Sequence, residues 1–311
     1  MTKLKLYEDY INKKISKHNY IREIFKHHQS LFEYSKLLKD SDIKSIKISE
    51  KEIIVEVKGI STIKMIIDET DLRFVPIEIL NFKKFEPEFT ELIFLFAKNS
   101  ENIIDIGANV GWYSLNFNSL AMVKNIHAFE PIPKTFNYLL KHIKLNNSKK
   151  IIPNNFALSE LNGEVEFLWH DKELGASSMV NIRELENIKK IKCKTMKLDD
   201  YVEQEKIKVD FIKCDVEGSE LLVFKGAENV LKDSQPIIFC EMLRMHAKKF
   251  NFHPNETILL LEGYGYKCFS RNINNSFEEI KEMTDETEET NYFFLHGTKH
   301  LAQIKEILSH L

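Results

Sequence analysis

Residues 103–111, which read Ile-Ile-Asp-Ile-Gly-Ala-Asn-Val-Gly, constrain the fold of this chain more than any other segment. An apolar run carries one acid, Asp105, and then meets Gly107 and Gly111 before an amphipathic stretch. This pattern predicts a buried strand that turns sharply into a helix. The N–H groups of such a turn and the positive end of the helix can hold a small anionic group. Glycine is otherwise scarce, at ten in 311 residues, so two at this turn indicate a tight bend or a close approach to a ligand.

From about residue 86, strand-like and helix-like segments alternate. Strands are predicted over 102–106, 125–130, 151–157, 209–215, 236–241, 265–269 and 291–295. Helices are predicted over 87–97, after Pro133, over 218–232 and over 255–262, with a hairpin of strands at 164–169 and 191–195 and an acidic loop at 277–290. This alternation predicts an α/β fold: a doubly wound, mostly parallel, seven-stranded Rossmann-like sheet.

The first 80 residues have a different pattern. Residues 1–40 are polar and rich in lysine, with apolar side chains at helical spacing, and residues 43–68 alternate with a period of two. We therefore predict a small N-terminal α+β module over 1–80 and a ligand-binding domain over 81–311. The lysines favour an exposed helix face over an acidic membrane surface. The module could mediate a homodimer, cover the site or contact a membrane-linked glycan, and the sequence leaves these open.

Composition excludes several classes of protein. A net charge of −3 does not favour a nucleic-acid partner. The four cysteines form no C-x-x-C pair, so reduced core thiols are expected rather than disulfides or a zinc site. The chain has neither a secretory h-region nor an apolar run of membrane-spanning length. We therefore expect a soluble, cytoplasmic protein with no transmembrane segment.

Four predicted strands end in a carboxylate: Asp105, Glu130, Asp215 and Glu241. In a parallel sheet these ends meet at one edge, which is where ligands bind. Any single acid there could cap a helix, but four beside a glycine turn indicate a cationic or polyhydroxyl ligand. Glu130 lies 25 residues after Asp105, where an acid can accept both hydroxyls of a ribose.

A dinucleotide-dependent oxidoreductase would also use a ribose-binding acid. Its fingerprint is G-x-G-x-x-G, whereas this chain has G-x-x-x-G with Asn109 in the middle. Asp105, two residues before the first glycine, would repel a pyrophosphate and suits a ligand with a positive end. S-adenosylmethionine carries a ribose diol, an amino group and a sulfonium, so a methyltransferase is favoured over the oxidoreductase.

At this point the chain resembles a known family. The segments Asp-Ile-Gly-Ala-Asn-Val-Gly (105–111), Phe-Glu-Pro (129–131), Asn-Phe-Ala-Leu-Ser (155–159) and Lys-Cys-Asp-Val-Glu-Gly-Ser-Glu (213–220) are similar to those of FkbM-type methyltransferases in order and spacing. The resemblance covers roughly residues 80–296, and Phe85-Glu86-Pro87 looks like the family's entry segment. It implies S-adenosylmethionine-dependent O-methylation, often of a sugar or polyketide hydroxyl.

The predicted cofactor site contains six residues. N–H groups of the turn at Gly107 and Gly111 would meet the methionine carboxylate, and Asp105 would orient the ammonium group. Asn109 could bind the same end or cap the following helix. The acid at position 130 would bind the ribose, and Asn155 would approach the adenine or hold a turn.

For catalysis, Asp215 is the leading candidate base, with Glu241 as a neighbouring helper. The two carboxylates could instead bind Mg²⁺, although a metal-free site is favoured. His246 is an alternative base. The excursion over 170–192 is predicted to cover a small-molecule or glycan acceptor. A non-catalytic binding or scaffold protein with this fold, and less so an NAD(P)-dependent oxidoreductase, remain the alternative functions.

Overall fold

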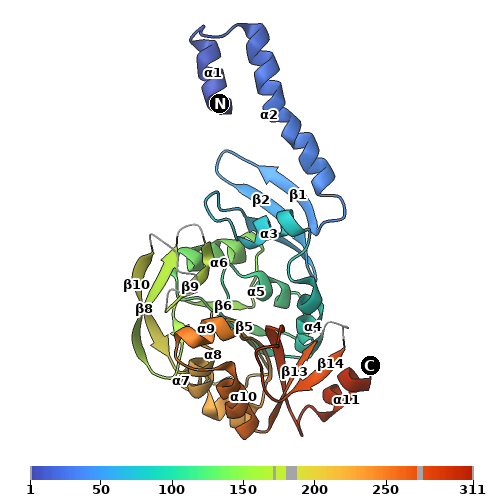
Figure 1. Cartoon of the computed structure of the whole chain (residues 1–311), viewed down its shortest axis with the longest axis vertical. Helices are drawn as coiled ribbons and strands as arrows, with labels where there is room; N and C mark the ends of the chain where they lie inside the picture. Colours follow the sequence, from blue (N-terminus) through green and yellow to red (C-terminus); the bar gives the residue numbers. More distant parts are fainter. Residues whose placement is uncertain (1, 171–172, 180–187, 272–275, 310–311) are drawn as a thin grey trace.

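The computed structural model describes residues 2–170, 173–179, 188–271 and 276–309 (Figure 1). Its main feature is an eight-stranded sheet with the order β14-β13-β15-β12-β11-β4-β5-β6. The strands are β4 (Asn102–Ile106), β5 (Asn125–Phe129), β6 (Ile151–Asn154), β11 (Phe211–Cys214), β12 (Ile237–Glu241), β13 (Tyr266–Arg271), β14 (Phe277–Ile280) and β15 (Asn291–His296). The five strands from β6 to β12 are parallel, and β15 joins them antiparallel.

Helices cover both faces of this sheet, because successive residues of its strands point to opposite sides. Ile103 and Ile126 pack in one core with α4 (Pro87–Ala97), α5 (Trp112–Phe117) and α6 (Pro133–Leu145). Ile104 and Ile212 pack in a second core with α7 (Leu198–Glu205), α8 (Glu220–Lys225) and α10 (Pro254–Gly263). The remaining helices of this part are α9 (Arg244–Lys249) and α11 (Leu301–Ser309). The predicted doubly wound, Rossmann-like α/β class is confirmed.

The predicted number of seven strands is wrong, because β14 forms an eighth strand inside the segment expected to be an acidic loop. Phe277 is buried and packs edge-on against Phe96 and Phe293, which anchors the strand. The acids face solvent, and Glu279 Oε2 lies 2.9 Å from Lys267 Nζ on β13. An edge strand needs only one buried side chain, so its sequence is as polar as that of a loop.

The prediction of one helix over 218–232 is also wrong. The observed helix α8 is interrupted after its last residue, and helical structure resumes as the π-helical segment η1 (Val230–Ser234). The break lies at Gly226, where a Cβ atom would come within 2.1 Å of the Ser159 carbonyl oxygen. The Asp199 carboxylate then accepts the N–H groups of Asn229 and Val230. Packing against a neighbouring loop therefore ends the helix.

A second sheet has the order β7-β10-β8-β9. Its strands are β7 (Ala157–Leu158), β8 (Gly163–His170), β9 (Glu173–Ser178) and β10 (Lys189–Met196). The antiparallel pairing of β8 with β10 confirms the predicted hairpin. In the excursion over 170–192, residues 171–172 and 180–187 lie outside the described residues, so its role as an acceptor cover stays a prediction.

The N-terminal region has two helices, α1 (Lys3–Ile11) and α2 (Lys17–Leu37), and an antiparallel sheet of β1 (Ile43–Ile48), β2 (Ile53–Lys58) and β3 (Thr62–Ile66), followed by α3 (Val75–Phe82). The helices project from the body of the molecule (Figure 1). The sheet joins the main core, and the Ile66 N–H donates to His142 Nε2 on α6 at 2.9 Å. The boundary at residue 80 stays a prediction.

Two expectations from composition can be compared with the structure. All four cysteines are free and buried, which confirms reduced core thiols. Within the described ranges, no helix has both the length and the apolar character needed to cross a membrane.

Candidate functional site

A pocket of about 690 Å³, counting its open mouth, lies at the carboxyl ends of β4, β5 and β11. This is the edge at which parallel α/β sheets bind ligands. Its walls combine apolar side chains with a few polar ones. They include Gly107, Asn109, Phe129, Glu130, Ile132, Leu158, Ser159, Phe167, Thr195, Asp215, Glu217 and Ser219. Four of the nine predicted site residues therefore line one pocket: Gly107, Asn109, Glu130 and Asp215.

The glycine turn after β4 has the predicted tight geometry. Gly107 and Gly111 have φ angles of +72° and +94°, in the left-handed region that favours glycine. A Cβ atom on Gly107 would lie 1.8 Å from the Asp215 carbonyl oxygen, so the turn packs directly on the chain that leaves β11. Gly111 occupies the N-cap of α5, and no side chain caps that helix. The alternative that Asn109 caps α5 is therefore wrong.

Several N–H groups of the turn are hydrogen-bonded within the protein, and the contact of the turn with the methionine carboxylate stays a prediction. The N–H groups of Gly107 and Ala108 both donate to the Phe129 carbonyl, at 3.0 and 2.9 Å. The Gly111 N–H donates to the Ala108 carbonyl at 2.9 Å. These donors are used up because the turn folds back onto the end of β5.

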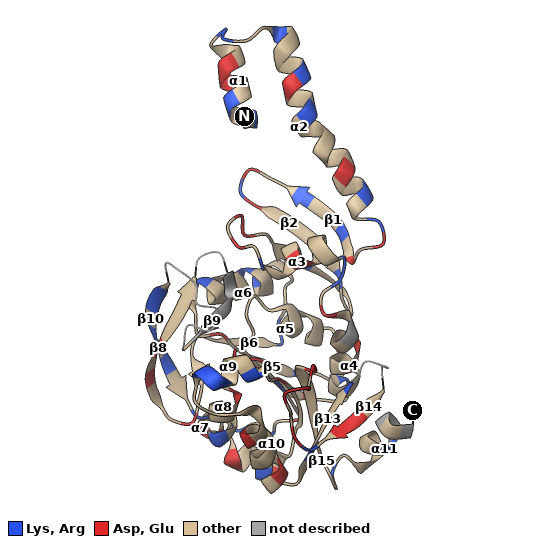
Figure 2. Ribbon diagram, viewed as in Figure 1, with Lys and Arg blue, Asp and Glu red and all other residues tan. Residues whose placement is uncertain are grey.

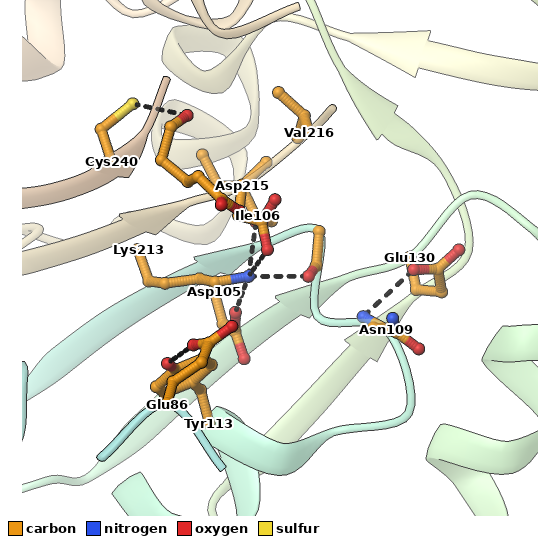
Figure 3. A network of polar contacts seen from close by, with 12 residues as sticks. Glu86, Asp105, Ile106, Asn109, Tyr113, Glu130, Lys213, Asp215, Val216 and Cys240 are labelled. Atoms are coloured by element: carbon orange, nitrogen blue, oxygen red, sulfur yellow. Dashed lines mark hydrogen bonds and ion pairs between the residues drawn. The ribbon is translucent and has the colours of Figure 1, made fainter. Parts of the chain in front are cut away.

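Glu130 closes the same turn from β5 and is 6% exposed. Its Oε2 accepts the Asn109 N–H at 3.1 Å (Figure 3), and its Oε1 accepts the Ile132 N–H at 2.8 Å. Burial raises the pKa of Glu130 to about 7, although these two hydrogen bonds oppose the rise. Each carboxylate oxygen keeps one lone pair for a ligand. Glu130 is therefore a fixed acceptor pair in the pocket wall.

Asn155 supports this arrangement from outside the pocket lining. Its Nδ2 donates to the carbonyl oxygens of Glu130 and Pro131, at 2.9 and 3.1 Å. The residue is exposed. These bonds hold the backbone that carries Glu130, and the direct contact of Asn155 with adenine stays a prediction.

Lys213 is the centre of a buried polar cluster behind the pocket (Figure 3). Its ammonium group donates to the Gly107 carbonyl at 2.9 Å and lies 3.3 Å from Asp215 Oδ2 and 3.8 Å from Asp105 Oδ1. It also lies 5.5 Å from the ring centroid of Tyr113. Burial alone would lower the pKa of Lys213, but the charges of the surrounding carboxylates outweigh it and raise the pKa. The ammonium therefore stays protonated and ties the turn to two strand ends.

Asp105 lies in this cluster and not in the pocket wall. It has no exposed surface, and its Oδ2 accepts the hydroxyl of Ser114 at 2.5 Å. Burial raises its pKa above the ordinary value, while the charge of Lys213 acts in the opposite direction. Asp105 can therefore influence a ligand only through Lys213 and the turn.

The carboxyl group of Glu241, at the end of β12, lies beside that of Asp215. Burial raises the pKa of Glu241 to about 10, and the charges of Asp215, Glu86 and Glu217 add to the rise. Glu241 therefore holds a proton at neutral pH. The Asp215 side chain is 34% exposed and lines the pocket. A buried protonated acid therefore lies next to a carboxyl group that faces the pocket.

Glu86 belongs to this region but was not among the predicted site residues. Glu86 precedes α4 with a φ of +41°, and its carboxylate accepts the hydroxyl of Tyr113 (Figure 3). Although Glu86 is an exposed residue, burial of its carboxyl end raises its pKa. Its signal in the sequence is the Phe85-Glu86-Pro87 segment. It adds a further acid beside Asp215 and Lys213.

The predicted base His246, on α9, lies outside the pocket lining. Its Nδ1 is 3.0 Å from Oε2 of Glu217, which does line the pocket. A Cβ atom on Gly218 would lie 2.7 Å from the backbone carbon of His246, so glycine allows α9 to approach. The structure therefore pairs His246 with a wall residue.

Glu220 fixes the loop between β11 and α8. It is 3% exposed, and its Oε1 accepts the N–H groups of Gly218 at 2.9 Å and Val216 at 3.3 Å. Burial raises its pKa to about 7. Glu220, the last acid of the segment 213–220, thus holds the loop that carries Asp215 and Glu217.

The residues of this site do not fit a divalent cation. In the part of the chain that the structure describes, no three His, Cys, Asp or Glu side chains are grouped to hold a metal ion. The Asp215 carboxylate already faces the Lys213 ammonium, which would repel a cation. We derive no chemical step through Mg²⁺.

Comparison with known proteins agrees with this geometry. The hexuronic acid methyltransferase AglP of Haloferax volcanii is 28% identical over 158 residues, which is 49% of this chain and 61% of AglP. Methyltransferase 1 of Beauveria bassiana is 24% identical over 183 residues, 52% of this chain and 71% of that protein. The chain therefore spans about three fifths of AglP.

The crystal structure of an FkbM methyltransferase from Methylobacillus flagellatus aligns with a TM-score of 0.40 at 15% identity, over 86% of this chain and 59% of that one. The family model described as the methyltransferase FkbM domain matches residues 105–268, which is more than half of the chain and spans the turn, Glu130 and the Lys213 cluster. The chain belongs to the FkbM methyltransferase domain family.

Proposed function

We propose that this protein is an S-adenosylmethionine-dependent O-methyltransferase that acts on a hydroxyl group of a sugar, a glycoconjugate or a related small molecule. One observation carries the proposal. A single pocket has a carboxylate suited to ribose hydroxyls, Glu130, in one part of its wall and the Asp215 carboxyl group, next to Glu241, in another. A site that binds a nucleoside and deprotonates a hydroxyl needs both.

The pocket residues fit S-adenosylmethionine. Ile132, Leu158 and Phe167 supply apolar wall for an adenine, and Glu130 has free lone pairs for the ribose hydroxyls. The carboxylates of Asp215 and Glu217 complement a cationic ligand. When bound, this cofactor would supply an electrophilic methyl group on a sulfonium.

In the proposed reaction, Asp215 takes the proton of the acceptor hydroxyl as the acceptor oxygen bonds to the methyl carbon and the carbon–sulfur bond breaks. Lys213, at 3.3 Å, holds the Asp215 carboxylate in place. The protonated Glu241 supports the same carboxylate from the other side. Because His246 is held behind Glu217, its role in the proposal is to orient that wall residue.

The acceptor class rests on one relative. AglP is named for hexuronic acid methylation, and the chain is 28% identical to it over 158 residues. We therefore place sugars first among the acceptors, with the binding functions assigned to residues 81–311.

Calorimetry would test the cofactor. S-adenosylmethionine, S-adenosylhomocysteine and NAD⁺ are titrated against the wild type, Glu130→Ala and the exposed-acid control Glu203→Ala. We expect the first two ligands to bind the wild type and the control, and to lose affinity in Glu130→Ala. Binding of NAD⁺ instead would refute the proposal.

Transfer of a labelled methyl group would test the reaction. We expect sugar hydroxyls to be labelled by the wild type, and Asp215→Asn to bind S-adenosylmethionine without transferring its methyl group. Labelling at nitrogen or carbon would refute O-methylation. Cofactor binding without transfer to any hydroxyl acceptor would favour the scaffold alternative.

A further inference from the structure

Helix α2 is longer than the helix that packs on it. It has 21 residues and no buried side chain, whereas α1 has nine residues. At 1.5 Å per residue the two helices are about 31 and 13 Å long. The ring of Tyr10 stacks on that of Tyr20, with 4.7 Å between the ring centroids. At the other end of α1, Lys3 lines a surface hollow that is also lined by Ser30 of α2. Helix α1 thus covers only the first half of α2.

The face of α2 that α1 covers continues beyond the end of α1. Tyr20, Ile24 and His27 are half-buried beside α1. The same alternating spacing of four and three residues continues along the chain to Leu31, Tyr34 and Leu38. Leu31 and Tyr34 are 50% and 44% exposed. They border an open hollow of about 1680 Å³, whose far wall is apolar side chains of β1 and β2 such as Ile46, Ile48 and Ile53. This hollow has room for another short helix.

A second apolar face of α2 lies about 100° around the helix from the first. It contains Ile21, Phe25 and Phe32, which are 53%, 54% and 66% exposed, with His28 between them. In total, nine large hydrophobic side chains of α1 and α2 are at least 41% exposed. At about 200 Å² for an aromatic side chain, their exposed parts amount to on the order of 800 Å² per chain. One partner in a standard protein interface buries about that area.

We propose that two copies of this chain associate through α1 and α2 as an antiparallel four-helix bundle. The two α2 helices cross near His28, so that Phe25 of one chain packs against Leu31 and Phe32 of the other. Each α1 helix stays on the first face of its own α2, so the two α1 helices lie side by side on the same side of the α2 pair. Two apolar faces about 90° apart are what each helix of such a bundle needs.

Charge supports this register. Arg22 and Glu33 lie on the same flank of the second apolar face, equally far from a centre near residue 28. In an antiparallel pair, equivalent flanks meet, so Arg22 faces Glu33 of the partner subunit. Figure 2 shows basic and acidic residues interspersed along α2 instead of a uniformly basic surface.

Analytical ultracentrifugation of the full chain tests the association. We expect a species of twice 36.6 kDa. Phe25→Asp with Phe32→Asp should weaken dimerisation by at least about 100-fold, because hot-spot aromatics each contribute tenfold or more. Arg22→Glu and Glu33→Arg should each weaken it about fivefold, and the double variant should restore it. A monomer at all concentrations, or a dimer that ignores these changes, would overturn the proposal.

Cysteine cross-linking tests the register against a background of four buried native thiols. Residue 28 meets its own copy at the centre of an antiparallel pair, so His28→Cys should form a covalent dimer under mild oxidation. The two copies of residue 21 would lie about 20 Å apart, so Ile21→Cys should not. Cross-linking of Ile21→Cys would indicate parallel helices and overturn the proposal. A monomer that binds phosphatidylserine vesicles through α2 would also overturn the proposal.

Discussion

We expect the affinity for the proposed cofactor to depend on pH, because the pKa of Glu130 is raised. If the ionised carboxylate accepts the ribose hydroxyls, the protonated form binds poorly. With a pKa of about 7, about a tenth of the protein has Glu130 ionised at pH 6 and about nine tenths at pH 8. The dissociation constant for S-adenosylhomocysteine should therefore be about tenfold higher at pH 6 than at pH 8, since it scales with the competent fraction.

Glu130→Gln separates this effect from other titrations. Glutamine does not ionise, so its pH dependence should be nearly flat. Its affinity at pH 8 should fall by about 30-fold, because the amide nitrogen would face either the Asn109 or the Ile132 N–H, which now donate to the two carboxylate oxygens.

Calorimetry at pH 6, 7 and 8 provides the measurement. Repeating the pH 6 titration in buffers of different ionisation enthalpy should show nearly one proton released by the wild type and almost none by Glu130→Gln. The reasoning fails if the wild-type affinity is flat between pH 6 and 8, or if the variant keeps the wild-type slope.

Three predictions concern stability and are measured by urea denaturation. Lys213→Met should lower the free energy of unfolding by about 3–5 kcal/mol, because it leaves the buried Asp105 without its cation; a loss below about 1 kcal/mol would contradict the cluster. Gly107→Ala should lower it by about 3 kcal/mol or more, since φ is +72° and the new Cβ would meet Asp215, whereas Gly263→Ala has no atom within 4 Å and should be nearly neutral. Burial raises the pKa of Glu220 from 4.5 to about 7, so the folded protein holds this proton more tightly than the unfolded chain does. The contribution to stability that is present below pH 4.5 is therefore lost as the pH rises through 7. Glu220→Gln should reduce the stability difference between pH 4.5 and pH 8 by about 3 kcal/mol relative to wild type, and an unchanged difference would argue against that pKa.

Local patterns predicted most of the fold. The parallel strands are continuous apolar runs because both faces of the sheet are covered. The turn can be recognised in the sequence because only glycine adopts the backbone conformation of Gly107 without strain. Elements with little burial or with distant partners were missed. The polar edge strand β14 depends on Phe277 reaching a distant core, and the break at Gly226 depends on the loop at Ser159.

The sequence by itself determined which edge of the sheet carries the site, because the acids follow strands whose direction the helical crossovers dictate. Only the tertiary structure decided which acids face the pocket. Lys213 lies in register with Asp105 on the neighbouring strand, so its ammonium group draws Asp105 inward, away from the ligand. Glu130 has backbone donors around it and stays in the wall. The direction of a buried charge depends on its partners across the sheet, and those lie about a hundred residues away in the chain.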